Sequence, residues 1–250
     1  DLPWRQKVTP YRIWISEIML QQTQVKTATP YFKNFIKKYP TQKKLSEASE
    51  DQILALWSGL GFYRRARNIF KTKEIIKEKY NNRFPKEFHQ LLELPGIGKS
   101  TAGAIMSLAY QNPHPILDGN VKRVITRLVN KNIDLLKESQ LWDLSSQFVN
   151  KENCFAYTQG IMDLGATVCT PTNPSCKDCP VQNQCMSAFN IINNKKRNVA
   201  QLKKVIPMNL SLIQTEDSLL LVKNEASSIW KNLWIPFESR SLESYTNSFK

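Results

Sequence analysis

Four cysteines within 17 residues constrain this chain more than any other feature of its sequence. They follow the spacing C-x6-C-x2-C-x5-C and are Cys169, Cys176, Cys179 and Cys185. A short loop with four sulfur ligands and intervening prolines is suited to wrapping around a metal centre. Disulfides are an alternative, but they require an oxidising compartment. A tetrahedral zinc site would use the same ligands, and the spacing alone does not exclude it.

The segment before the cysteines is typical of short helices. Thr9-Pro10 begins the first of these helices, and apolar residues then recur at helical spacing up to Met19. Gly and Pro separate the others, and strand-like alternation is absent. We therefore expect an all-α class with further helices at Tyr31–Tyr39, Glu50–Trp57, Arg64–Tyr80, Glu87–Leu92, Thr101–Tyr110, Val121–Asn130, Ser139–Val149 and Phe155–Leu164.

The composition changes near residue 191. Residues 193–198 are polar and basic and indicate a linker, whereas Val205–Leu212 and Ser218–Val222 predict β-strands. Fewer than 50 residues follow residue 205, which is short for an independent fold. We expect the beginning of a second, truncated α/β domain. Because the chain opens on Asp1 rather than Met, we also expect that a segment precedes it.

The charge balance favours a polyanionic partner. Lys and Arg number 35 against 21 Asp and Glu, a formal net charge of +14. A basic surface without a partner is the alternative, and charge alone does not decide between the two. The apolar runs are too short for a membrane span, and no secretion signal opens the sequence.

Residues 94–102 join two predicted helices through a Gly-rich turn. Gly96 and Gly98 precede Lys99 and Ser100, so backbone N–H groups at the second helix can face a phosphate oxygen. An ordinary tight turn is the alternative, but Pro95 and the charge on Lys99 favour phosphate binding. This arrangement is typical of a helix-hairpin-helix, which contacts the DNA backbone without sequence specificity.

Two carboxylates are candidates for acid–base chemistry. Glu17 lies within an apolar helical stretch, where burial raises a carboxyl pKa and retains a proton near neutral pH. Asp118 precedes the helix expected from Val121, so it is either a helix N-cap or a functional anion. Glycosidic cleavage needs one carboxylic acid for the leaving group and one carboxylate facing the sugar cation.

Several motifs in a fixed order resemble the adenine DNA glycosylases of the MutY type, within the endonuclease III helix-hairpin-helix superfamily. The resemblance extends from Asp1 to Cys185 and continues more weakly to Trp234. Besides the hairpin and the cysteines, its motifs are Trp14–Val25, Gly59–Tyr63 and Leu117–Val124.

This resemblance implies a six-helix barrel at residues 6–115 and an iron–sulfur cluster domain at 116–190, joined by residues 1–5. A linker at 191–204 and an incomplete Nudix-like C-terminal domain at 205–250 would follow. DNA would bind across the groove between the barrel and the cluster domain. The four cysteines would hold a 4Fe–4S cluster.

The implied reaction is base excision repair, in which adenine mispaired with 8-oxoguanine or guanine is removed from double-stranded DNA. Glu17 falls where the family's general acid lies, and Asp118 falls on the carboxylate that stabilises the oxocarbenium ion. Asn120 matches a polar residue that supports this site. The expected enzyme is a monomeric hydrolase of N-glycosyl bonds in the bacterial cytoplasm, associated with the nucleoid.

The resemblance also assigns the DNA contacts. Gln22 and Phe62 fall where the family wedges the opened base stack, and the hairpin supplies Gly96, Gly98, Lys99 and Ser100. Ser100 stands where lyases of the superfamily carry a Schiff-base lysine, so we expect a monofunctional glycosylase or one with weak lyase activity. Phe62 replaces the family's usual Tyr, so stacking is retained but a hydroxyl contact is lost.

Overall fold

A computed structural model describes residues 2–190, 208–225 and 230–238. Contacts divide the chain into two units, Asp1–Lys195 and Lys196–Lys250. The predicted linker at residues 191–204 lies outside the described residues.

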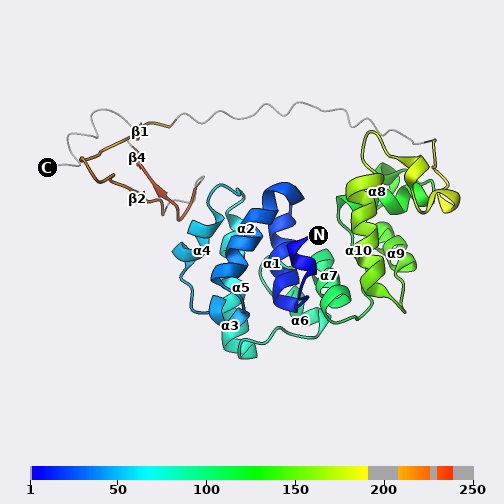
Figure 1. Ribbon diagram of the computed structural model, residues 1–250, viewed down its shortest axis with the longest axis horizontal. Coiled ribbons are helices and arrows are strands. Elements are labelled where there is room, and N and C mark those ends of the chain that lie inside the picture. Colours follow the sequence, from blue (N-terminus) through cyan, green and yellow to red (C-terminus); the bar gives the residue numbers. More distant parts are fainter. Residues whose placement is uncertain (1, 191–207, 226–229, 239–250) are drawn as a thin grey trace. The chain divides into compact units, whose positions relative to one another are not determined.

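The described part of the first unit is helical (Figure 1), which confirms the all-α prediction. Its helices are α1 Pro10–Leu20, α2 Val25–Lys38, α3 Gln42–Leu45, α4 Glu50–Trp57, α5 Arg64–Tyr80, α6 Phe88–Leu92, α7 Lys99–Ala109, α8 Gly119–Leu128, α9 Glu138–Phe148 and α10 Cys154–Asp163. Short 3-10 turns occupy Pro3–Arg5, Ile133–Leu135, Cys176–Asp178 and Gln182–Gln184, and a π-helical turn occupies Leu164–Val168. Within the described residues, we find no helix with the length and apolar character needed to span a membrane.

Two helices differ from the sequence prediction. α2 begins at Val25 rather than Tyr31, with Pro30 inside it. Pro30 lies in the second turn, where it costs the helix one backbone hydrogen bond, and the fully buried Ala28 anchors the first turn. α3 was not predicted; the Thr41 side chain caps this single turn, and Leu45 is fully buried.

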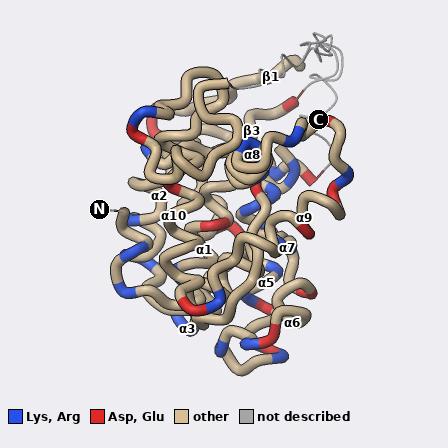
Figure 2. The backbone as a smooth tube through the Cα atoms, turned by 90° about the vertical axis from the view of Figure 1, so that its right-hand side faces the viewer, with Lys and Arg blue, Asp and Glu red and all other residues tan. Residues whose placement is uncertain are grey.

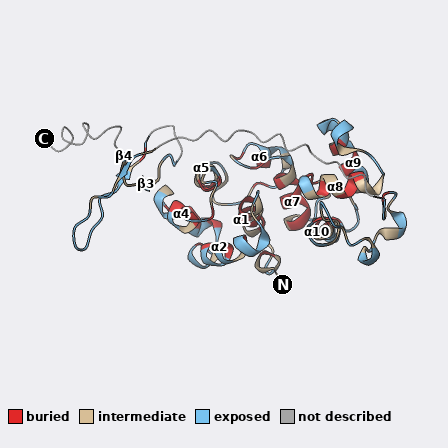
Figure 3. Cartoon of the chain, turned by 90° about the horizontal axis from the view of Figure 1, so that it is seen from above, coloured by how far each residue is buried: buried red, intermediate tan, exposed pale blue. Residues whose placement is uncertain are grey.

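The core of the helical unit forms around α1. Its buried side chains include Ile13, Trp14 and Ile18, and α1 packs against α2, α5 and α7. α7 in turn packs against α6 and α10, while α8 packs against α9 and α10. Figure 1 therefore shows α1 and α7 between α2–α5 on one side and α8–α10 on the other, and Figure 3 shows the same order with the buried faces in red.

An ion pair joins the N-terminal segment to the last helix. Arg5 Nη1 donates to Asp163 Oδ2 at 2.9 Å, on α10. Pro3–Arg5 also contacts α1 and α2, so the expected grouping of residues 1–5 with residues 116–190 stays a prediction. The domain boundary between residues 115 and 116 stays a prediction.

The described part of the second unit contains short antiparallel strand pairs. β1 Leu210–Ser211 pairs with β4 Phe237–Glu238, and β2 Val222–Lys223 pairs with β3 Trp234–Ile235. Of the strand predicted at Val205–Leu212, residues 205–207 lie outside the described residues, and only Leu210–Ser211 is strand. At Ser218–Val222, pairing is limited to a bridge at Leu219 and the start of β2. These pairs are consistent with the beginning of an α/β domain.

Candidate active site

Glu17 lies on the C-terminal half of α1. Its side chain is half-buried among apolar neighbours, in contrast to a solvated helix edge. Burial raises its pKa from the usual 4.5 to about 7, and the charge of Asp118 adds to the shift. A carboxyl with this pKa holds a proton in a large share of molecules at neutral pH. The contribution of Asp118 indicates that the fold brings its carboxylate within electrostatic range of Glu17.

Asp118 is the N-cap of α8 and is exposed. Its Oδ1 accepts a hydrogen bond from the Val121 backbone N–H at 2.7 Å. The N-cap alternative is therefore confirmed, but it does not conflict with a functional anion. A carboxylate has two oxygens, and the cap holds the side chain in one orientation while using Oδ1. The positive end of the helix dipole also favours a negative charge at this position.

Asn120, in the first turn of α8, belongs to a hydrogen-bond network that the sequence reasoning missed. Arg123 Nη2 donates to Asn120 Oδ1 at 2.8 Å and to the Gly165 carbonyl at 2.6 Å. Arg123 Nε donates to the Cys169 carbonyl at 2.8 Å. Through these hydrogen bonds, Arg123 connects the first turn of α8, just after Asp118, to Cys169, the first of the four clustered cysteines. In the sequence, only the position of Arg123 three residues after Asn120 on a predicted helix indicates that these two side chains are neighbours.

The hairpin between α6 and α7 lies beside Asp118. Gly96 adopts φ +83°, and a Cβ on it would lie 2.8 Å from Asn68 Nδ2, so glycine is required there. Gly98 is the N-cap of α7, and Lys99 begins the helix with an exposed side chain. Ser100 Oγ accepts a hydrogen bond from the Leu117 backbone N–H at 3.0 Å. This bond ties the start of α7 to the residue before Asp118.

Gln22 and Phe62 lie in separate turns, and both adopt left-handed backbone conformations. Their φ angles are +55° and +51°. Both side chains are exposed, and Phe62 is 59% exposed despite its large aromatic ring. Eight other non-glycine residues within the described part of the chain share this conformation, so the exposure of the Phe62 ring is the more distinctive feature.

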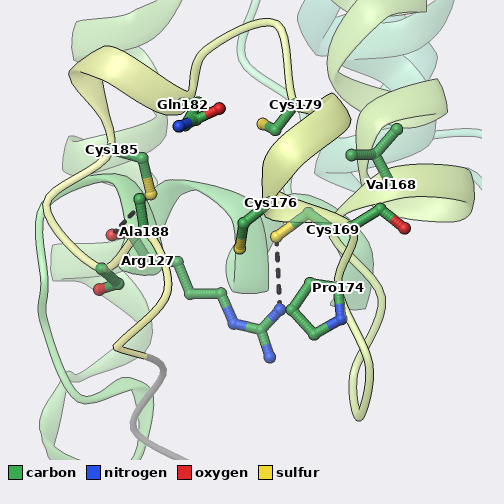
Figure 4. A pocket seen from close by; sticks show the side chains of 11 residues that line it. Arg127, Val168, Cys169, Pro174, Cys176, Cys179, Gln182, Cys185 and Ala188 are labelled. Carbon is green, nitrogen blue, oxygen red and sulfur yellow. Dashed lines mark hydrogen bonds between the residues drawn. The ribbon is translucent and has the colours of Figure 1, made fainter.

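The four clustered cysteines line one cavity, as Figure 4 shows. All are free thiols and partly buried. Arg127 Nη1 donates to Cys169 Sγ at 3.4 Å. Burial and, to a smaller extent, the neighbouring cysteines raise the pKa of Cys185. Within the described residues, no three His, Cys, Asp or Glu side chains are already gathered tightly enough to hold a metal ion. The donor set of four thiols around one cavity nevertheless fits a thiolate-ligated centre.

Comparison with known proteins gives a family for this arrangement. Residues 15–141 match the family of HhH-GPD superfamily base excision DNA repair proteins. An adenine DNA glycosylase of Buchnera aphidicola subsp. Schizaphis graminum is 46% identical over 240 residues, which cover 94% of this chain and 69% of the relative. The human adenine DNA glycosylase is 39% identical over 197 residues, covering 74% of this chain and 36% of the relative.

Solved structures agree on the fold. A thermostable thymine-DNA glycosylase superposes with a TM-score of 0.69 at 28% identity, covering 76% of this chain and 89% of the other. A non-covalent endonuclease III–DNA complex superposes with a TM-score of 0.64 at 24% identity, covering 72% and 85%. This chain belongs to the HhH-GPD superfamily of base excision DNA repair proteins and, within it, to the adenine DNA glycosylases. The resemblance inferred from the sequence motifs is thereby confirmed, and DNA is the partner.

Proposed function

We propose that this chain hydrolyses the N-glycosidic bond of adenine mispaired with 8-oxoguanine or guanine in double-stranded DNA. One observation carries the proposal. Glu17 has a pKa raised to about 7, chiefly by burial and further by the charge of Asp118, a carboxyl from a distant part of the sequence. Pairs of carboxyls held in different environments are how glycosidases divide acid and anion roles.

Each carboxyl has one role in the proposed reaction. Protonated Glu17 donates its proton to a ring nitrogen of adenine as the bond to the sugar breaks. The charge on Asp118 faces the positive charge that develops on the sugar, and Asn120 supports this site. Water then adds to the sugar carbon and leaves an abasic site. Because Ser100 supplies no amine for a Schiff base, strand cleavage is weak or absent.

The hairpin and the basic surface supply the contacts to DNA in this proposal. Figure 2 shows Lys and Arg distributed over the helical unit rather than confined to one element. The N-terminal turn of α7, with Gly96, Gly98, Lys99 and Ser100, binds backbone phosphate. Gln22 and Phe62 enter the stack as adenine is extruded, a step that costs a few kcal/mol and less at a mispair. The enzyme acts as a monomer at the bacterial nucleoid.

The four clustered cysteines hold a 4Fe–4S cluster in this proposal. Such a cluster would fix the shape of the Cys169–Cys185 loop through four thiolate bonds. Freshly purified protein is expected to be brown and to contain about four irons per chain. Colourless protein with a single zinc would contradict the cluster proposal. Replacing Cys176 with Ser should weaken DNA binding more than it changes the helical circular dichroism signal.

The function is tested with duplexes that carry adenine opposite 8-oxoguanine, adenine opposite guanine, or thymine glycol. We expect the two adenine duplexes to break only after alkali treatment, because alkali cleaves abasic sites. Breakage at thymine glycol without alkali would instead indicate a lyase for oxidised pyrimidines. Binding without breakage in any duplex would indicate a DNA-binding protein without activity.

A further inference from the structure

Arg65 on α5 is a buried cation whose guanidinium donates to four backbone carbonyls. It is only 7% exposed. Its Nη1 donates to the carbonyls of Ile18, Met19 and Gln21, at 3.1, 2.7 and 2.6 Å. Its Nη2 donates to the Gly61 carbonyl at 3.2 Å. A single guanidinium therefore connects the end of α1 to the turn before Phe62.

The two connected segments carry the proposed wedge residues. Gln21 directly precedes Gln22, and Gly61 directly precedes Phe62. The carbonyls bonded by Nη1 belong to the last turn of α1, where helix geometry leaves carbonyls without partners and a positive charge is favourable. Glu17 lies on the same helix. Arg65 thus touches the backbone that positions all three proposed functional side chains.

Aromatic packing fixes the guanidinium in this place. It lies 5.3 Å from the ring centroid of Trp57 and 5.3 Å from that of Phe62. Trp57 Nε1 also donates to the Gly61 carbonyl, at 3.0 Å. The Phe62 ring therefore stacks on Arg65, and the Gly61 carbonyl before it accepts hydrogen bonds from Arg65 and Trp57. These interactions explain how an exposed aromatic residue maintains φ +51°.

We propose that Arg65 is a positioning residue that holds the Gln22 and Phe62 turns in register with each other and with Glu17 for adenine extrusion. The inference rests on the proposed function of the site. A lysine could not replace this arginine, because an ammonium on a flexible stem lacks the planar fork that bonds two segments at once and stacks on a ring.

The test compares Arg65→Lys with Arg64→Lys, an exposed neighbour on α5. Both changes retain the formal charge, so the electrostatic attraction to DNA is matched. For Arg65→Lys we expect single-turnover excision at an adenine–8-oxoguanine pair to fall about 10- to 100-fold, the scale of a small misplacement. Duplex affinity stays within about 3-fold of the parent, since phosphate contacts dominate it. Arg64→Lys excises at the parent rate.

Two readouts separate positioning from general structural damage. The fluorescence rise of 2-aminopurine placed next to the target adenine, which reports unstacking, is slower in Arg65→Lys. The excision defect shrinks at least several-fold when the adenine lies in an unpaired bulge, because extrusion is then partly complete before binding. A defect of equal size on both substrates, with a normal fluorescence rise, would overturn the proposal.

A milder variant covers the case in which Arg65→Lys folds poorly. Tyr31 OH donates to the Ser58 carbonyl at 3.0 Å, at the start of the same Gly59–Tyr63 turn. Tyr31→Phe removes this bond without changing ring volume, and we expect a smaller slowing of extrusion in the same direction. A normal extrusion rate in Tyr31→Phe together with an unfolded Arg65→Lys would count against the proposal. If the parent protein excises adenine from neither duplex, the proposed function fails instead.

Discussion

The C-terminal half of α1 and the N-terminal end of α8 place the same chemical group in opposite environments. Glu17 lies inside a helix, half-buried among core residues, and burial raises its pKa to about 7. Asp118 is exposed at a helix N-cap and accepts the Val121 backbone N–H. A helix interior against the core favours the protonated carboxyl, whereas a helix N-terminus favours the anion. The difference in position supports the proposal that Glu17 is the acid and Asp118 the anion.

The largest expected effect comes from removing the anion. Asp118→Asn should lower single-turnover excision by about 10²- to 10³-fold or abolish it, because the developing sugar cation loses its counter-charge. Asparagine caps helices as well as aspartate does, so the thermal unfolding midpoint should change little. Gel-shift affinity for the mispaired duplex should also be retained. Excision near the parent rate would show that Asp118 is only a cap.

Removing the acid should have the next largest effect. Glu17→Gln keeps the side-chain shape but has no transferable proton, so excision should fall by roughly 10²-fold or more. In the parent, excision should decline as pH rises through about 7, because Glu17 then loses its proton. The variant should lack this decline. A parallel loss of duplex binding and excision would make Glu17 a structural residue and would remove the contrast with Asp118.

The sequence predicts the local environment of each carboxyl, but it does not predict that the two carboxyls lie near each other. Apolar residues at helical spacing place Glu17 on a core-facing helix, and the short polar segment before Val121 predicts a cap at Asp118. Periodicity contains no information about which helices pack together. The electrostatic influence of Asp118 on Glu17 is therefore visible only in the folded structure.

The supporting arginines show the same limit. Arg65 and Arg123 each donate hydrogen bonds to carbonyls more than 40 residues away in sequence. Charged residues on amphipathic helices are usually solvated, so nothing local distinguishes these two from the other basic residues. The four cysteines, by contrast, were found easily, because their spacing along the chain itself predicts a shared site.

The stability of the protein should also reflect the raised pKa of Glu17. Its folded pKa of about 7 lies above the ordinary 4.5, so its contribution to the free energy of unfolding is complete below about pH 4.5 and is lost as pH rises through 7. Glu17→Gln does not ionise and should therefore be more stable than the parent at pH 8, by on the order of 1–3 kcal/mol.

Denaturant melts of both proteins between pH 5 and pH 8 would measure this difference, which should grow with pH. The exposed Glu78→Gln on α5 serves as the control and should show no such trend. An equal stability difference at all pH values would mean that Glu17 is not desolvated in the folded protein, and the contrast with Asp118 would then rest on geometry alone.

The smallest expected effect concerns the contact that supports Asp118. Ser100 Oγ accepts the Leu117 N–H, so Ser100→Ala leaves a partly buried donor without its partner at a cost of about 1 kcal/mol. Because Leu117 directly precedes Asp118, we expect excision to slow by no more than about 5-fold, with a fall in the unfolding midpoint of about 2–4 °C. Ser100→Thr should restore both values. Ser146→Ala, an exposed serine on α9, should change neither. If Ser100→Ala lowers the midpoint without changing the rate, the hairpin stabilises the fold but does not position Asp118, and α8 alone sets the orientation of the carboxylate.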